Sequence, residues 1–331
     1  MTQAKKFKLS DDMLRLVIFL IILAIFAIIN PRIVSIANIV SLFNNMVFTG
    51  IMALGLMMLL VIGTLDLAIS AYAVFGAYGM LSFCMQHWMG VNLWVMLIGA
   101  GILAGLSGTV TGVLIYKLKL PGILVSVATS NIFFMIHYLD GYGSGNVPAT
   151  QVPPHMLTLN KLNVFSATVG KMTVQLNVSV IILIVLAVLT WLFLNKTMTG
   201  RSIYAIGGNP EAAERMGINV FRTYVIVFFL AGMLAGIAGM QSYMKQMSVS
   251  PLTSLQGSHA NALAACIFGG TQLGNGKGGS VIGTMIGVLT ITLISTSLVM
   301  LGVPSYAQTF VIGLLILASV VLAASKNLKV R

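Results

Sequence analysis

The feature that most constrains this chain is a series of long apolar stretches, separated by short segments that carry nearly all of the charge. Of its 331 residues, 58% are hydrophobic and only 7% are charged. Soluble domains carry roughly 25% charged residues. So few charges cannot cover the surface of a soluble protein of this size, so we expect most of the chain to lie in lipid. The sequence therefore predicts an integral membrane protein.

The apolar stretches predict an all-α polytopic membrane protein with about ten transmembrane helices, because a spanning helix needs roughly 20 mostly apolar residues. The eighth stretch is too short to cross without its glycine-rich continuation. The remaining connections are short, so we expect one transmembrane domain over residues 1–331 with no soluble appendage. The predicted spans are 14–30, 39–62, 66–86, 92–116, 122–140, 177–195, 222–243, 257–270, 280–301 and 305–324.

The basic residues predict the orientation, because cytoplasmic loops are enriched in Lys and Arg. Ten crossings place both termini on one side, together with the loop 196–221, and leave the loop 141–176 on the other. The first side carries Lys5, Lys6, Lys8, Arg15, Lys117, Lys119, Lys196, Arg201, Arg215, Arg222, Lys277, Lys326, Lys329 and Arg331. The second side carries Arg32, Lys161, Lys171 and Lys245. We therefore expect both termini in the cytoplasm. The charges form no dense patch, so we expect no nucleic-acid partner.

A glycine-rich stretch, GGTQLGNGKGGS, raises the possibility of a nucleotide site at 269–280. Its Gly-x-Gly-x-x-Gly spacing between two apolar runs is that of a dinucleotide-binding turn. However, no acidic residue follows Glu214, so the partner for the ribose is missing. Thr271 and Gly278 stand where a P-loop needs Gly and Ser or Thr. We interpret the stretch as a bend near the cytoplasmic face, anchored there by Lys277.

Other residues argue for packing rather than chemistry. Cys84 and Cys266 lie in apolar stretches without metal-ligand spacing, and no paired carboxylates, histidine cluster or activated nucleophile is apparent, so a membrane enzyme is disfavoured.

Glycines four residues apart predict helices that approach closely in lipid. These pairs are Gly101 and Gly105, Gly108 and Gly112, Gly232 and Gly236, and Gly283 and Gly287.

The most informative polar segment is GGNPEAAERMGINVFR, which begins at Gly207. Asn209 is suited to cap the free N–H groups of a first helical turn. Pro210 fits the first helical position, and Gly217 fits a left-handed C-terminal cap. The segment predicts a short helix over Pro210–Met216 in the cytoplasmic loop. Such a helix either docks on a partner or is a solvated connector.

This loop resembles that of the sugar-type ABC importer permeases, the family of ribose, xylose, galactose and autoinducer-2 permeases. VIGTLDLAIS is similar to the family's Gly-Gly-Ile-Asp-Leu-Ser segment, with Asp66 at the aspartate. GILAGLSGTVTGVLIYKLKLPGILVSVATSNI is similar to its fourth and fifth spans, and AACIFGGTQLGNGKGGSVIGTMIGVL to its C-terminal glycine-rich hairpin. The resemblance runs through most of the chain and implies a type II ABC importer-like permease in the bacterial cytoplasmic (inner) membrane.

The resemblance also implies partners. Two permease subunits, identical or different, would be driven by two cytoplasmic ATP-binding-cassette ATPases, and an extracytoplasmic binding protein would deliver a sugar or sugar-like cargo. ATP and magnesium would be bound by the ATPases, so this chain would hold no cofactor and would not itself be an enzyme. The predicted short helix would be the coupling helix that seats in the ATPase. Its residues are Asn209, Pro210, Glu211, Ala212, Ala213, Glu214, Arg215, Met216, Gly217 and Ile218.

Four polar residues in apolar stretches are candidates for the pathway or gate: Asp66, Asn131, His259 and Asn261. Asp66 is either a gate residue or a structural cap at the start of the third span, since an acid in lipid is costly. The other three either line the pathway or make helix-to-helix hydrogen bonds.

The main competing interpretation is a secondary transporter driven by an ion gradient. Such proteins usually need buried carboxylates or unwound helices to hold the coupling ion. Only Asp66 and Asp140 are available for that role. The outer segment DGYGSGNVPATQVPPH is expected either to receive the binding protein or to form a simple irregular loop.

Overall fold

The computed structural model describes residues 11–136, 150–169, 172–246, 255–272, 278–304, 306–314 and 317, and it is dominated by helices. The α-helices are α1 (Asp11–Ile29), α2 (Ile36–Val61), α3 (Ile69–His87), α4 (Leu93–Leu118), α5 (Gly122–Met135), α6 (Ser179–Lys196), α7 (Met198–Gly208), α8 (Pro210–Arg215), α9 (Val220–Gln246), α10 (His259–Phe268) and α11 (Val281–Met300). Two short 3-10 helices, η1 (Pro31–Val34) and η3 (Pro154–Lys161), and two strands, β1 (Asn163–Val169) and β2 (Met172–Asn177), complete the described part.

Six of these helices are long and apolar enough to cross a membrane: α1, α2, α4, α6, α9 and α11. Two shorter apolar helices, α5 and α10, lie within predicted spans. The prediction of an all-α polytopic membrane protein is therefore confirmed, whereas the count of ten and the placement of the termini stay predictions. Of the last predicted span, residues 306–314 are helical, and most of the rest lies outside the described residues.

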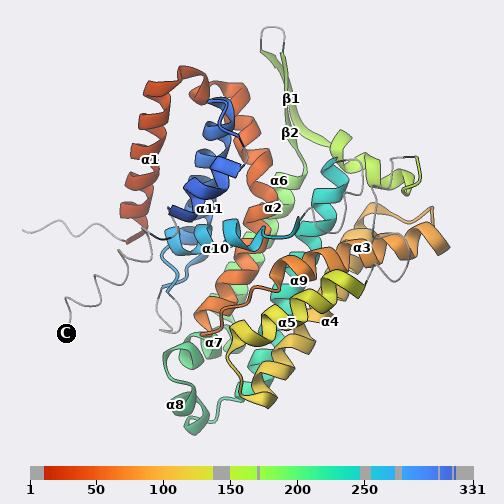
Figure 1. Cartoon of the computed structure of the whole chain (residues 1–331), viewed down its shortest axis with the longest axis vertical. Helices are drawn as coiled ribbons and strands as arrows, with labels where there is room; N and C mark the ends of the chain where they lie inside the picture. Colours follow the sequence, from red (N-terminus) through yellow and green to blue (C-terminus); the bar gives the residue numbers. More distant parts are fainter. Residues whose placement is uncertain are drawn as a thin grey trace, which may run out of the picture.

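The helix α2 is the central element of the fold. It packs against α6, α9, α10 and α11, and most of its length is buried (Figure 1). The pair α4 and α9 forms the most extensive helix contact, and α3 packs across both. On the other side α1 packs on α11, beside the smaller cluster of Ile33, Leu42 and Leu293. An apolar α1 with no buried residue presents its surface to lipid, as expected for a peripheral span.

The predicted close packing at the glycine pairs is confirmed. A Cβ placed on Gly232 would meet the carbonyl oxygen of Ala104, and one on Gly236 would meet that of Ala100. At the C-terminal pair, a Cβ on Gly287 would meet the carbonyl oxygen of Ala265. Backbone therefore touches backbone between α4 and α9 and between α10 and α11, which only a residue without a side chain allows.

The predicted outer loop 141–176 contains regular structure after Pro153. β1 and β2 pair as an antiparallel hairpin, with Ser166 opposite Gln175 and a register irregularity between Asn163 and Phe165. The sequence NVFSATV-GK-MTVQLN is typical of a hairpin, because β-favouring residues flank a Gly-containing two-residue turn. No strands were predicted in this loop, so the hairpin is an addition to the predicted fold. Residues 141–149 lie outside the described part.

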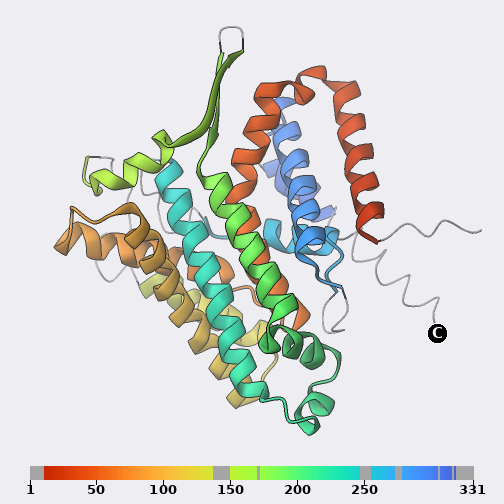
Figure 2. The ribbon, with the colours of Figure 1, turned by 180° about the vertical axis from the view of Figure 1, so that it is seen from behind.

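The loop 196–221, predicted to be cytoplasmic, contains a helix that was not predicted, because α7 precedes the expected short helix. Thr197 is the C-cap of α6. Its side-chain oxygen also accepts from the N–H of Gly200, so the same residue is the N-cap of α7. α7 and α8 lie at one end of the molecule, and the hairpin lies at the opposite end (Figures 1 and 2).

Candidate functional site

The short helix α8 forms where the sequence predicts it. The side chain of Asn209 accepts from the N–H of Ala212 over 3.0 Å, and Pro210 occupies the first helical position. Gly217 has φ +83°, the left-handed conformation expected of a C-terminal cap. The helix ends at Arg215, one residue earlier than predicted, with Met216 as the C-cap. The side chain of Asn209 thus defines the start of this helix, and the left-handed Gly217 defines its end.

The surface of α8 is almost entirely free. Ala213 is its only buried residue and holds the helix against the protein. Glu211, Glu214 and Arg215 are exposed, and Met216 is 69% exposed. Within the described residues the sole ion pair joins Arg15 and Asp12, so these three charges have no ionic partner in that part of the chain. The arrangement combines unpaired charges with one exposed apolar side chain.

The α7–α8 unit is tied to the membrane helices in two ways. α8 leads directly into α9, and the N–H of Ile218 donates to the carbonyl of Ala213 over 3.1 Å. Independently, the hydroxyl of Tyr204 on α7 donates to the carbonyl of Gly279, just before α11. α8 is therefore joined to α9 by a short connection, and α7 is hydrogen-bonded to the segment that precedes α11.

The glycine-rich stretch 269–280 is described at its two ends. Gly270 and Gly278 have φ +77° and Gly279 has φ +70°, so the chain bends where side chains would be strained. Ser280 then caps α11 by accepting from the N–H of Gly283. Residues 273–277, and with them the predicted anchor Lys277, lie outside the described part.

Asp66 is fully buried in the non-helical segment between α2 and α3. One carboxylate oxygen accepts from the N–H of Ala68 over 2.7 Å, and the other accepts from the hydroxyl of Tyr72 over 2.9 Å. The neighbouring N–H of Leu67 donates to Ser126 on α5. Asp66 lies two residues before the residue that caps α3, so it supports the start of that helix without being its N-cap. Irregular backbone at this depth is tolerated when it is enclosed by protein in this way.

His259 connects α10 with α3. Its Nδ1 lies 3.1 Å from the hydroxyl of Ser70, so the N-terminal ends of α10 and α3 meet, and the two helices run away from each other (Figure 1). Asn261, two residues further along α10, is half-buried. The structure thus brings Asp66, Tyr72, Ser70 and His259 into one polar region across the start of α3.

Asn131 does not belong to that region. It lies on the outer face of α5 and is exposed, beside Ile132, which is 60% exposed, and near Leu124, which is 62% exposed. The four predicted pathway residues therefore divide into a central group and one isolated surface position. Whether any of them serves the pathway stays a prediction.

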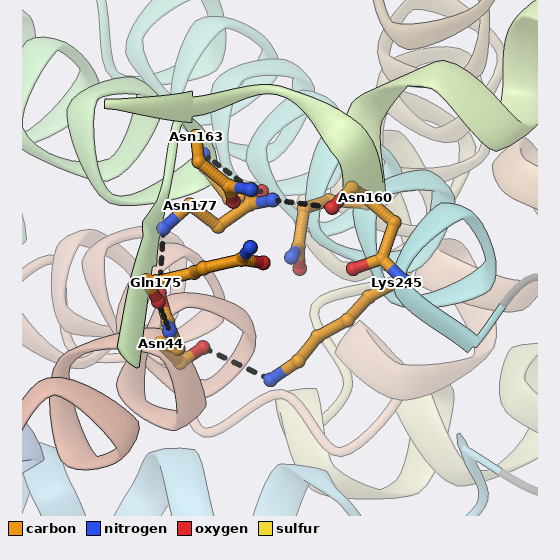
Figure 3. Close-up of a pocket in the computed structure, with 8 residues that line it drawn as sticks. Asn44, Asn160, Asn163, Gln175, Asn177 and Lys245 are labelled. Atoms are coloured by element: carbon orange, nitrogen blue, oxygen red, sulfur yellow. Dashed lines mark hydrogen bonds between the residues drawn. The ribbon is translucent and has the colours of Figure 1, made fainter. Parts of the chain in front are cut away.

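Sequence reasoning missed a polar cavity at the hairpin end. It is lined by Asn44, Asn160, Asn163, Gln175, Asn177, Ser179, Gln241 and Lys245, which come from α2, η3, the hairpin, α6 and α9 (Figure 3). Only Lys245 had been noted, as an outward-facing charge. Asn44 and Gln241 are polar residues just inside the ends of the second and seventh predicted spans, and they could have indicated this site. Nothing in the sequence, however, shows that they lie close together.

Comparison with known proteins identifies the family. The family model described as "Branched-chain amino acid transport system / permease component" matches residues 38–320. Ribose import permease protein RbsC of Bacillus subtilis (strain 168) is 30% identical over 98% of this chain and 98% of its own length. L-arabinose transport system permease protein AraH of Escherichia coli (strain K12) is 29% identical over 95% of this chain and 90% of its own.

Autoinducer 2 import system permease protein LsrC of Enterobacter sp. (strain 638) is 28% identical over 92% of this chain and 84% of its own length. No solved structure matches the chain. The resemblance to importer permeases found in the sequence is confirmed, and the relatives match almost end to end. This chain is thus a multi-pass protein of the bacterial inner membrane and belongs to the family of ABC importer permease components.

Proposed function

We propose that this chain is the translocating subunit of an ABC importer that carries a sugar or sugar-like small molecule into the cytoplasm. The names of the relatives support the cargo class, since they include ribose, L-arabinose and autoinducer 2. Energy comes from ATP and magnesium held by partner ATPases, because the chain carries neither a P-loop nor the acid of a dinucleotide fold. An extracytoplasmic binding protein delivers the cargo.

The observation that carries this proposal is the exposed, doubly capped helix α8. A partner protein can bind this helix because both of its ends are capped, Ala213 is its only buried residue, and its charged side chains form no ion pair with one another. Glu211, Glu214 and Arg215 offer charges, and Met216 offers an adaptable apolar contact. Residues Asn209 to Ile218 therefore form the coupling helix, seated in a groove of the ATPase.

The distribution of basic residues supports a cytoplasmic position for α8. Six Lys or Arg residues lie near the ends of helices that meet at the α8 end: Lys117, Lys119, Lys196, Arg201, Arg215 and Arg222 (Figure 1). Fewer lie at the hairpin end, among them Arg32, Lys161 and Lys245. Since cytoplasmic ends are the basic ones, the hairpin faces the outside and both termini lie in the cytoplasm.

A second permease subunit covers the outer face of α5. Asn131 exposes a carboxamide on a surface that is otherwise apolar. An amide facing lipid would leave hydrogen bonds unmade, at a cost of about 1–3 kcal/mol. Contact with another subunit, or with a water-filled path between two subunits, removes that cost.

Closure of the ATPases would then move α8, and with it α9 and α11, to switch access from outside to inside.

The test is reconstitution with the cognate ATPase and binding protein. We expect the chain to co-purify with the ATPase and, in liposomes, to accumulate a sugar only when ATP and the binding protein are present. Ribose and arabinose are the first probes. Uptake by this chain alone, driven by a sodium or proton gradient, would refute the proposal and establish the ion-driven alternative, which no described feature specifically favours.

A further inference from the structure

The polar cavity at the hairpin end is built and held in shape by hydrogen bonds. The amide of Asn44 on α2 donates to the carbonyl of Gln175 over 2.8 Å, and its oxygen accepts from the N–H of Asn177 over 3.0 Å. These two bonds fasten β2 to α2. Asn177 in turn donates to the carbonyl of Leu159 and accepts from Ser179, so η3 and α6 are fixed as well. The cavity is thus a preformed feature of the fold.

Polar side chains reach into this cavity from opposite sides. In Figure 3 Gln175 extends from the strand toward the centre, while Lys245 reaches across from α9. The ammonium of Lys245 donates to the carbonyl of Asn44 over 3.1 Å and to the side-chain oxygen of Asn45 over 3.0 Å. An ammonium has three N–H donors, so these two bonds leave one for a further partner.

One buried atom in the lining points to a ligand. The side-chain oxygen of Gln241 is buried, with the residue only 1% exposed, and it has no hydrogen-bond partner among the described residues. A buried carbonyl oxygen without a donor is costly, so such atoms usually mark a site that something else completes. Because the atom is an acceptor, the missing group must carry an O–H or N–H.

The space is sufficient for a small molecule. The cavity encloses about 160 Å³, and an adjoining one of about 420 Å³ shares Asn44, Gln241 and Lys245 with it. The second is also lined by Phe48, which supplies an apolar ring beside the amides. Small-molecule sites commonly measure about 300–1,000 Å³ and combine apolar walls with a few placed polar groups.

We propose that this joined cavity, here called the mouth site, binds a neutral polyhydroxylated molecule of the monosaccharide class on its way into the membrane. Side-chain amides offer donors and acceptors together, which matches hydroxyl groups that are also both. An anion would leave the oxygen of Gln241 facing negative charge. A metal cation would be repelled by Lys245, and no carboxylate lies among the described lining residues. The mouth site rests on the proposed function, because it makes the cargo's first contact with the permease.

A protection experiment on the purified chain tests the mouth site directly. Asn163→Cys places a thiol in the lining, while Ser166→Cys places one on the exposed part of the same strand as a matched control. The native Cys84 and Cys266 are buried and give the background. Labelling by a small maleimide is followed in the presence of ribose, arabinose, xylose and galactose, with gluconate as the anionic comparison.

We expect at least one neutral sugar to slow labelling at 163 and not at 166. Gln241→Leu in the Asn163→Cys background should weaken the apparent affinity by about fivefold, the effect of one lost hydrogen bond. Lys245→Met should do the same, and Lys161→Met, which removes an exposed lysine outside the lining, should not. Using two independent variants keeps the test valid if one of them fails to fold.

Three results would overturn the mouth site: no neutral sugar protects, only gluconate protects, or the apparent sugar affinity is unchanged in both Gln241→Leu and Lys245→Met. The proposed function fails by different results. An importer that accumulates sugar with ATP while position 163 stays unprotected refutes the mouth site alone. Protection in a chain that neither binds an ATPase nor imports refutes the importer role and leaves the mouth site standing.

Discussion

The hydroxyl of Tyr204 donates a hydrogen bond to the carbonyl oxygen of Gly279 over 2.9 Å. Tyr204 belongs to α7, beside the proposed coupling helix, and Gly279 lies two residues before α11. Burial raises the pKa of Tyr204, so its phenol stays protonated at neutral pH and remains a donor. The bond therefore connects the loop 196–221 to the start of α11, across 75 residues of sequence.

Tyr204→Phe should uncouple ATP hydrolysis from transport without preventing assembly. The substitution removes one hydrogen bond worth about 0.5–1.5 kcal/mol while keeping the ring in place. We expect near-normal ATPase association and a fall in sugar accumulated per ATP hydrolysed, measured in liposomes. Tyr306→Phe, at a residue that is 79% exposed, is the control. An unchanged transport-to-hydrolysis ratio would show that the link transmits nothing.

Reversing the charges of α8 should weaken ATPase binding. Glu211→Lys with Glu214→Lys alters two exposed residues that have no ion pair among the described residues, so the fold should persist. Co-purification with the ATPase and transport-coupled hydrolysis should both drop. Asp11→Lys, at another exposed acid that begins α1, is the control. Full transport by the double variant would rule out α8 as the coupling helix.

Asn209→Ala should loosen α8 locally. Loss of an N-cap costs about 0.5–2 kcal/mol, which for a two-turn helix held only at Ala213 is a large share of its stability. Hydrogen exchange of the segment 210–216 should become faster, whereas α9 should stay protected. Asn209→Asp retains the capping oxygen and should restore the slow exchange. Equal exchange in all three proteins would contradict the capping role.

Asp66→Ala should destabilise the protein. The substitution leaves the N–H of Ala68 and the hydroxyl of Tyr72 without their acceptor, at about 1–3 kcal/mol for each buried group. Thermal unfolding in detergent should occur at a lower temperature, and Asp66→Asn, which keeps an acceptor oxygen, should lose less. An Asp66→Asn variant that is as stable as the parent but transports nothing would instead identify Asp66 as a gate.

Gly232→Ala should be among the most disruptive single-methyl changes in the chain. The new Cβ would meet the carbonyl oxygen of Ala104 on α4, and overpacking of this kind costs about 1–3 kcal/mol. After heating, the detergent-solubilised protein should lose its monodisperse size-exclusion peak at a lower temperature than the parent. Gly313→Ala introduces the same methyl into open space and should leave that temperature unchanged. Equal temperatures for both variants would contradict the backbone contact.

Local chemistry explains which parts of this protein were predictable. α8 was found because Asn209, Pro210 and Gly217 each act on the backbone within a few residues of their own position. The apolar spans were found because lipid dictates their composition over whole helices. The close approach of α4 and α9 was visible in glycines four residues apart, although the sequence did not say which helix faces which.

The parts that were missed depend on residues that are distant in sequence. The mouth site needs Asn44, Gln175 and Gln241 to converge, and no periodicity links those positions. The surroundings of Asp66 could be predicted only in part. Tyr72, which donates to Asp66, is nearby in sequence, whereas Ser126, which accepts from the N–H of Leu67, comes from another helix. The hairpin and α7 are formed by residues that are close in sequence. They were missed because the segments between predicted spans were expected to be loops.

The direct contact of backbones between α4 and α9 also limits how the protein can change shape. Two helices whose glycines meet carbonyl oxygens cannot slide or rotate against each other without a clash, so together with α3 they behave as one solid block. Motion during a transport cycle must then occur at the boundaries of that block. α11 lies outside that block: it packs on α1, α2 and α10, and it contributes both to the main core, through Val288 and Ile291, and to the small cluster of Ile33, Leu42 and Leu293. A displacement of α8 would therefore carry α9, α4 and α3 together as one unit, while the bond of Tyr204 would pass part of it to the start of α11.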